Sequence, residues 1–250
     1  MKLSLCLNSA TGSLERTEAM KLAKKLGYTA VEFWEGKDFD LAAYKSALTE
    51  TKLTLACMGF GSNLVDPGSR AEFLDNIKTS LDNALKLGAK GIIVTTGQEI
   101  EAVPRDKQHQ SIIDGLKEGS KIIADSGIQL LLEPLNTLIN HPGYFLYSSL
   151  EAFDIIREVN SPNVKLLFDI YHQQVSEGNL IANICDNIDL IGHFHAAGNP
   201  GRGEPYLGEI NYKEVFAAID NSGYTAYVGL EFWPKEDFET SLKKCLELYG

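Results

Sequence analysis

Short apolar runs alternate with amphipathic stretches from one end of the chain to the other. Near-continuous apolar runs of this length are typical of strands that are buried on both faces in a parallel sheet. The stretches between them repeat their apolar positions at helical spacing. The strands are predicted at Leu3–Leu7, Ala30–Phe33, Leu53–Met58, Gly91–Val94, Ile128–Leu132, Val164–Phe168, Leu190–Phe194 and Ala226–Leu230.

Helices are predicted in the stretches between these strands. Glycine follows several of them, at Gly27, Gly88, Gly127 and Gly223, where it fits the left-handed residue that closes a helix. The predicted helices are Glu15–Leu26, Leu41–Thr51, Arg70–Leu87, Gln108–Ser126, Ser149–Val159, Leu180–Asn187, Tyr212–Ser222 and Lys235–Leu248.

One helix per strand, repeated along the chain, indicates a parallel sheet with right-handed crossovers. We therefore predict an α/β protein, a single-domain (β/α)8 TIM barrel that spans residues 1–250. An open doubly wound sheet is the alternative, and it usually has a glycine-rich phosphate turn after its first strand. The turn here, Asn8–Ser13, lacks the pattern G-x-G-x-x-G.

Charge narrows the choice of partners. The chain has 250 residues and a formal net charge of −11. An acidic balance disfavours nucleic acid, which needs a basic face, and it disfavours anionic membrane surfaces. We expect a small-molecule partner, with no nucleic acid and no membrane, and homo-oligomer formation stays open.

The cysteines are scattered and form no C-x-x-C pair. We interpret them as buried, reduced thiols, which indicates a reducing compartment. The chain starts directly with a predicted strand, and neither a signal peptide nor a membrane-spanning run is evident. These observations predict a cytoplasmic protein. The cysteines are Cys6, Cys57, Cys185 and Cys245.

Ionisable residues stand at the ends of the last four predicted strands: Glu133, Asp169, His195 and Glu231. In a barrel of this kind the active site lies at the carboxyl ends of the strands, so the four side chains should converge. Three carboxylates within about 6 Å repel one another, and a divalent cation relieves that repulsion. An oxygen-rich set with one imidazole suits Mg²⁺ or Mn²⁺, with Co²⁺ or Zn²⁺ as alternatives.

Structural interpretations compete with this one. A strand-end acid such as Asp169 is often a helix cap, and His193, which shares a strand face with His195, is more often a hydrogen-bonded core residue than a ligand. Arg202 could be a solvated loop residue. The placement of the set on four successive strands favours a metal site.

Further candidates lie near the same strand ends. His172 and Asn136 each follow a candidate ligand by three residues, and the glycine-rich and proline-rich stretch 193–211 is predicted to be a loop over the site. Arg202 in this loop suits a substrate carboxylate or hydroxyl. Glu32 and Trp34, at the end of the second predicted strand, could wall the pocket. We expect the substrate to be bound by His172, Arg202, Asn136, His193, Glu32 and Trp34.

Several motifs resemble those of the hydroxypyruvate isomerase family, in the xylose isomerase-like TIM-barrel superfamily, which includes ketose 3-epimerases. The resemblance covers essentially the whole chain. The motifs are Leu132-Glu-Pro-Leu-Asn-Thr137, His141-Pro-Gly-Tyr-Phe-Leu146, Phe168-Asp-Ile-Tyr-His-Gln173, Gly192-His-Phe-His195, Asn199-Pro-Gly-Arg-Gly-Glu-Pro205, Gly208-Glu-Ile-Asn-Tyr212 and Gly229-Leu-Glu-Phe232.

The resemblance implies that Glu133, Asp169 and Glu231 bind metal and that Glu133 and Glu231 move protons. The expected reaction is the isomerisation of a hydroxy-carbonyl compound in carbohydrate metabolism, in the first place hydroxypyruvate to tartronate semialdehyde. The resembled isomerases often have Gln at the position of His195, whereas ketose 3-epimerases have His, so a 3-epimerase is the alternative. An AP endonuclease or an inactive metal-binding barrel is less favoured.

Overall fold

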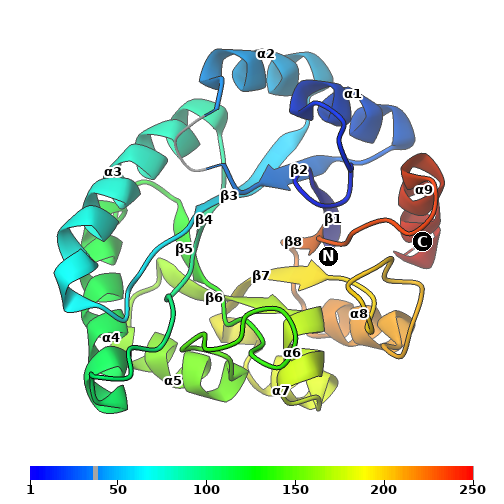
Figure 1. The fold of residues 1–250 in the computed structure, drawn as a ribbon. Coiled ribbons are helices and arrows are strands. Elements are labelled where there is room, and N and C mark those ends of the chain that lie inside the picture. Colours follow the sequence, from blue (N-terminus) through cyan, green and yellow to red (C-terminus); the bar gives the residue numbers. More distant parts are fainter. Residues whose placement is uncertain (36–38, 250) are drawn as a thin grey trace.

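The strands of the computed structural model form one closed parallel barrel in sequential order, with β8 beside β1 (Figure 1). The structure describes residues 1–35 and 39–249. The predicted TIM barrel is therefore confirmed. The strands are β1 (Lys2–Cys6), β2 (Ala30–Phe33), β3 (Thr54–Phe60), β4 (Gly91–Val94), β5 (Gln129–Leu132), β6 (Val164–Asp169), β7 (Ile191–Ala196) and β8 (Tyr227–Leu230).

Helices surround the barrel, as Figure 1 shows. Gly27 and Gly88 close their helices with φ values of 104° and 76°, as the sequence predicts. The helices are α1 (Arg16–Leu26), α2 (Leu41–Thr51), α3 (Arg70–Leu87), α4 (Arg105–Ile122), α5 (Ser149–Val159), α6 (Ile170–Ser176), α7 (Leu180–Asp186), α8 (Tyr212–Asn221) and α9 (Phe238–Tyr249), with 3-10 turns at Pro67–Ser69 and Ile188–Leu190.

Helix α6 is absent from the sequence prediction. It follows β6 without a loop, and it is too short to show a helical period. Its start is fixed by Asp169, whose side chain accepts from the backbone N–H groups of Tyr171 and His172. The helix holds His172 beside the strand end.

Two strand boundaries differ from the prediction in a way that matters for the site. β7 runs from Ile191 to Ala196, because Leu190 ends a 3-10 turn, so His195 lies within the strand and not after it. β3 extends to Phe60. The rigid ladder therefore positions His195 directly, through its pairing with Asp169 of β6.

The barrel interior is apolar on one side and polar on the other. Cys57, Ile93, Leu131 and Leu167 form a buried apolar cluster from β3 to β6. The strands on the far side contribute buried polar side chains instead, namely Ser4, Glu32, His193 and His195. Burial of such groups is costly unless they are paired, so these side chains need polar partners inside the barrel.

The expectation of buried cysteines is wrong for one of them. Cys6, Cys57 and Cys245 are buried, but Cys185 in α7 is exposed, and all four are free thiols. The α7 pattern turns that position toward solvent. Within residues 1–35 and 39–249, no helix has the length and apolar character needed to cross a membrane.

Candidate active site

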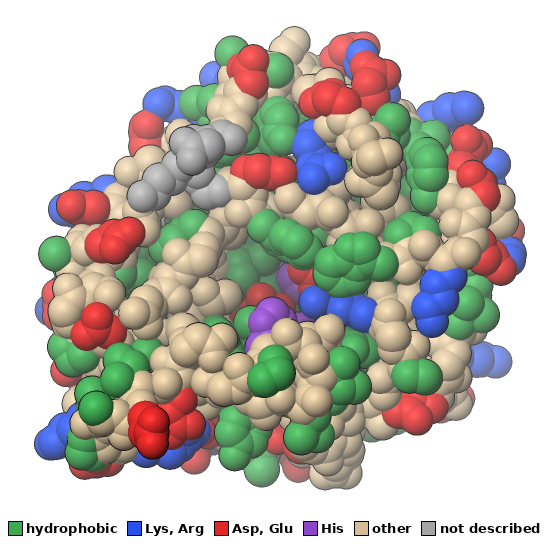
Figure 2. All heavy atoms as spheres, in the orientation of Figure 1, with side chains coloured by type: hydrophobic (Ala, Val, Ile, Leu, Met, Phe, Trp, Pro, Cys, Tyr) green, Lys and Arg blue, Asp and Glu red, His purple; other side chains and the backbone are tan. Residues whose placement is uncertain are grey.

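A cavity of about 200 Å³ opens at the carboxyl ends of the strands. Figure 2 shows the hollow near the centre of this face, with acidic, basic and histidine side chains inside it. The cavity is lined by Trp34, Gly59, Phe60, Gly61, Ile93, Thr95, Glu133, Leu135, His141, His172, Arg202 and Glu231.

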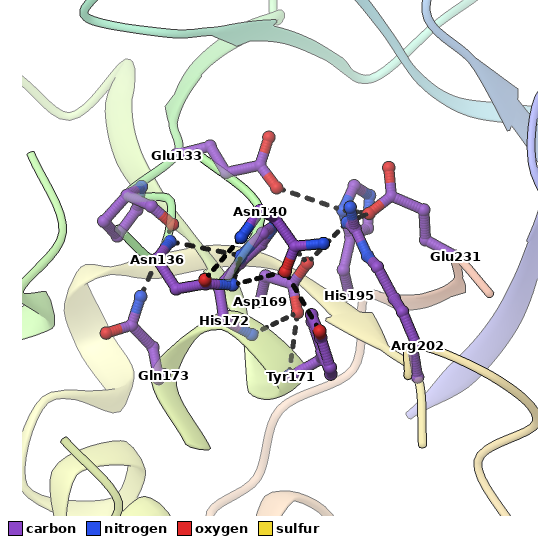
Figure 3. A network of polar contacts seen from close by, with 12 residues as sticks. Glu133, Asn136, Asn140, Asp169, Tyr171, His172, Gln173, His195, Arg202 and Glu231 are labelled. Carbon is purple, nitrogen blue, oxygen red and sulfur yellow. Dashed lines mark hydrogen bonds and ion pairs between the residues drawn. The ribbon is translucent and has the colours of Figure 1, made fainter. Parts of the chain in front are cut away.

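The four predicted ligand residues lie together, and two of them, Glu133 and Glu231, line this cavity. Glu133, Asp169, His195 and Glu231 are buried, and each offers one donor atom such that all four atoms lie within 4.8 Å of one another. His195 Nδ1 lies 3.4 Å from Glu133 Oε1 and 3.2 Å from Glu231 Oε2. Figure 3 shows the two glutamates approaching His195 from opposite sides.

Asp169 uses its two oxygens differently. Oδ1 accepts hydrogen bonds from the backbone N–H groups of Tyr171 at 2.8 Å and His172 at 3.1 Å, at the start of α6. Oδ2 faces the site, 3.0 Å from Arg202 and 3.5 Å from His172 Nε2. The helix-cap and ligand interpretations of Asp169 are therefore compatible, because one oxygen caps the helix and leaves the other free for the site.

Arg202 lies inside the site and is not a solvated loop residue. Its guanidinium pairs with both Asp169 and Glu231. The guanidinium carbon also lies 4.9 Å from the ring centroid of Trp233. The loop after β7 places Arg202 in the left-handed region, with φ of 53°. A cation therefore lies beside the carboxylates, where it also lines the cavity.

His172 is held from behind by Asn136. The backbone N–H of Asn136 donates to His172 Nδ1 at 3.2 Å, and Asn136 Nδ2 lies 2.6 Å from the same nitrogen (Figure 3). Nε2 of His172 then points toward Asp169 and the cavity. Asn136, which is expected from the sequence to bind substrate, is fully buried and is not among the residues that line the cavity, so in this structure it supports His172.

Glu32 and His193, two of the residues expected to bind substrate, are not among the residues that line the cavity. Glu32 Oε2 is 3.0 Å from His193 Nε2, and Glu32 Oε1 is 2.8 Å from His195 Nε2. Both residues face the barrel interior beneath the candidate ligands. Strand alternation explains this, because side chains on the inner face below the strand ends point into the core.

Trp34 lines the cavity as expected, whereas the sequence did not single out His141, which lines it, or Trp233, which lies beside Trp34 and Arg202. His141 lies in the loop after β5, with its ring 5.4 Å from that of His172. Trp233, whose ring lies 6.2 Å from that of Trp34, follows Glu231 by two residues. The sequence could have indicated both residues, since His141 begins the motif His141-Pro-Gly-Tyr and Trp233 follows a strand end. Neither position belongs to a periodic pattern, so the alternation of strands and helices does not identify it.

The pKa values of the two glutamates in the site are shifted in opposite directions. Burial raises the pKa of Glu133 to about 7, with Glu231 and Asp169 adding to the increase against the opposing effect of His195. Burial also acts to raise the pKa of Glu231, but Arg202 and His195 outweigh it and lower that pKa. Two carboxyl groups with divergent proton affinity are an arrangement suited to acid and base roles.

The same burial and neighbouring charges shift the pKa values of the two histidines in the site. Burial acts to lower the pKa of His195, but Glu231 and Glu32 raise it well above its usual value. Burial and the nearby Arg202 lower the pKa of His172 well below its usual value. His172 is therefore suited to act as a neutral hydrogen-bonding group.

The donor set fits a divalent cation. Among the described residues, Glu133 Oε1 and His195 Nδ1 are buried without a hydrogen-bond partner, and both face the centre of the set. Such atoms are costly to bury unless a ligand satisfies them. Three carboxylate groups and one imidazole match the preference of hard or borderline divalent ions.

A closed (β/α)8 barrel with ionisable side chains in a cavity at its carboxyl end belongs to the class of barrel enzymes. Comparison with known proteins identifies the family within this class. The family model described as "Xylose isomerase-like TIM barrel" matches residues 20–248, and the chain belongs to this family.

The curated relatives of the chain are isomerases, and we assign the chain to the isomerases of this family. Hydroxypyruvate isomerase of Escherichia coli (strain K12) is 31% identical over 97% of each chain. The 2-oxo-tetronate isomerase of Cupriavidus necator is 31% identical over 84% of each chain.

Solved structures agree with this fold. A Brucella melitensis structure described as an AP endonuclease of family 2 is 30% identical, covers 99% of each chain and has a TM-score of 0.93. D-psicose 3-epimerase of Clostridium cellulolyticum H10 has a TM-score of 0.84 at 18% identity, which shows a shared fold.

Proposed function

We propose that the chain is a metal-dependent isomerase of a small hydroxy-carbonyl acid, with hydroxypyruvate converted to tartronate semialdehyde. The observation that carries this proposal is the placement of Glu133 and Glu231 on opposite sides of His195 Nδ1, at the bottom of a cavity that also presents Arg202. The names of the relatives at 31% identity support the same substrate class.

Glu133, Asp169, His195 and Glu231 would hold the divalent ion. When bound, such an ion polarises a carbonyl group and makes the adjacent C–H bond more acidic. The chain's own contribution is to keep three carboxylates and one imidazole within reach of one point while excluding bulk water.

The isomerisation needs one proton removed and one returned. One glutamate takes a proton from the hydroxymethyl carbon, and the electron pair of that C–H bond forms an enediolate with the former carbonyl. The other glutamate gives a proton to the neighbouring carbon, which carried the carbonyl. The hydroxyl proton passes from the first oxygen to the former carbonyl oxygen, so the first carbon becomes the aldehyde and the second carries the hydroxyl. The reaction is redox-neutral, and two acid/base groups on either side of a planar intermediate provide what it requires.

Arg202 and His172 orient the substrate in this proposal. The guanidinium offers a planar pair of donors that suits a carboxylate. His172, held neutral and aimed by Asn136, can hydrogen-bond a substrate oxygen from the other side. A cavity of about 200 Å³ is smaller than typical ligand pockets, which favours a small substrate.

Epimerisation of a ketose at its third carbon is the second candidate. His195 within the donor set favours it, because the resemblance associates histidine at this position with the 3-epimerases. The same two glutamates would then act on opposite faces of one carbon. An AP endonuclease has less support, since the net charge of −11 opposes binding to DNA.

A product screen by ¹H NMR tests the proposal. The purified chain, loaded with Mg²⁺ or Mn²⁺, is incubated separately with hydroxypyruvate, 2-oxo-tetronate and C4–C6 ketoses. We expect an aldehyde product from hydroxypyruvate, or a 3-oxo acid from 2-oxo-tetronate, and no turnover of either substrate in the presence of EDTA. Turnover of ketoses alone would favour the epimerase, and turnover that persists in EDTA would contradict metal dependence.

A further inference from the structure

A second group of buried polar side chains lies beneath the four candidate ligands and has no role in the reaction described above. Ser4 of β1, Glu32 of β2 and His193 of β7 point into the barrel interior, and each is less than 5% exposed. Cys57 of β3 contributes a thiol 3.6 Å from His193 Nε2. A carboxylate at this depth is expensive to bury and calls for a physical explanation.

Glu32 connects this group to the site above it. Its Oε1 lies 2.8 Å from Nε2 of His195, as an ion pair. Its Oε2 lies 3.0 Å from His193 Nε2 and accepts a hydrogen bond from Ser4 Oγ. The opposite ring nitrogen of His195, Nδ1, faces Glu133 and Glu231. The two nitrogens of one imidazole thus join Glu32 to the candidate metal ligands.

The barrel wall is shaped to admit this carboxylate. Gly229 of β8 pairs in register with His195 on one side and with Ser4 on the other. A Cβ atom at position 229 would lie 2.1 Å from Glu32 Oε1. Because glycine has no side chain, Gly229 leaves the space through which Glu32, on β2, reaches a histidine on β7.

We propose that Glu32 is a positioning residue that fixes the orientation and tautomer of His195 for metal binding. A histidine ligand must present a lone pair to the metal, and a partner on its other nitrogen decides which nitrogen carries the hydrogen. Glu32 holds the N–H on Nε2, and this leaves Nδ1 available at the site. The inference rests on the metal dependence in the proposed function.

A second metal site in the lower group is the main rival. One donor atom from each of Glu32, Cys57, His193 and His195 lies within 4.8 Å of the others. The contacts favour the positioning role. Oε2 of Glu32 is already paired with Ser4 and His193, and Oε1, which has no hydrogen-bond partner among the described residues, lies 2.8 Å from His195 Nε2. An N–H on His195 Nε2 would satisfy Oε1 without a cation.

Glu32→Gln tests the positioning role with little change in size. The matched control is Glu151→Gln, because Glu151 also faces a histidine, with Oε1 3.0 Å from His109 Nδ1, but it lies on the outside of the barrel. We expect Glu32→Gln to weaken Mn²⁺ binding about 10–100-fold, as is typical when a ligand loses its supporting partner. Glu151→Gln should bind Mn²⁺ as the wild type does. Titration calorimetry gives affinity and stoichiometry.

The outcomes are distinct. A folded Glu32→Gln variant with wild-type Mn²⁺ affinity would overturn the positioning role and leave the proposed function intact. Two Mn²⁺ ions per wild-type chain, falling to one in the variant, would make Glu32 a ligand instead. Wild-type protein that binds no Mn²⁺ would overturn both proposals.

A measurement on the wild type covers the case in which the variant does not fold. Long-range ¹H–¹⁵N correlation of the Mg²⁺-loaded protein reports which nitrogen of His195 carries a hydrogen. We expect the hydrogen on Nε2, with Nδ1 unprotonated. A hydrogen on Nδ1 would overturn the proposal.

Discussion

In the proposed function, Arg202 is the residue on which substrate choice should depend most. Its guanidinium lines the cavity and is buried against Trp233, while it pairs with Asp169 and Glu231. A hydrogen bond to a charged group contributes about 1.5–3 kcal/mol, which corresponds to roughly 10- to 100-fold in affinity. A substrate carboxylate should therefore depend on this side chain much more than a neutral sugar does.

We predict that Arg202→Ala raises KM for hydroxypyruvate at least about tenfold, and for a neutral ketose substantially less. Arg105→Ala is the control, because Arg105 pairs with Glu151 outside the barrel. Initial rates over a range of substrate concentrations provide the comparison. An equal effect of Arg202→Ala on both substrates would show that Arg202 does not recognise a carboxylate.

At the level of elements, the side chain of Asp169 both caps helix α6 and faces the candidate site. Asp169 Oδ1 caps the helix and Oδ2 faces the site, so the two functions can be separated by substitution. Asparagine is as good a helix N-cap as aspartate, whereas alanine loses the cap at a cost of about 0.5–2 kcal/mol.

Asp169→Asn and Asp169→Ala should both weaken metal binding, but they should differ in stability. Both remove the charge that faces Arg202, and only Ala also removes the cap. We predict that the free energy of unfolding, measured by urea without metal, is lower in Asp169→Ala by about 1 kcal/mol. Equal stability of the two variants would show that the cap contributes nothing to α6.

At the scale of the whole molecule, metal binding should stabilise the fold. The four candidate ligands come from β5, β6, β7 and β8 or the residues just after them, so an ion would join separate parts of the barrel. A ligand at a hundred times its Kd stabilises the native state by about 2.7 kcal/mol.

We predict that saturating Mn²⁺ raises Tm by about 5–10 °C, since each kcal/mol corresponds to about 2–4 °C in a chain of this size. The increase should be reversed by EDTA and should be smaller in Asp169→Asn. Differential scanning calorimetry measures both. A Tm that does not respond to Mn²⁺ in the wild type would contradict the metal site.

The barrel could be predicted from the sequence because its buried strands and amphipathic helices alternate with a regular period. The convergence of Glu133, Asp169, His195 and Glu231 followed from barrel geometry alone. Helix α6 is too short to carry a period, and it was missed. Strand alternation places Glu32 and His193 on the inner face of the barrel, but no local pattern shows which side chains they contact there. Their partners lie on β1, β3, β7 and β8, far away in the chain.

The central claim is that Glu133 and Glu231 transfer protons as well as bind metal. Replacing either with Gln keeps the size and one potential ligand oxygen but removes the basicity. With three ligands left, each variant should retain some metal. Turnover should fall by at least the ~10²–10⁴-fold typical of a lost general base. The double variant should be little worse than either single one, because residues that act as a unit are non-additive.

The most direct measurement is the turnover of hydroxypyruvate by wild type, Glu133→Gln and Glu231→Gln, followed by ¹H NMR at saturating Mg²⁺, with metal content determined for each sample. The account predicts folded variants that contain metal and show severe losses of turnover for both substitutions. A metal-loaded variant of either glutamate that turns over hydroxypyruvate at a near wild-type rate would contradict the two-glutamate mechanism.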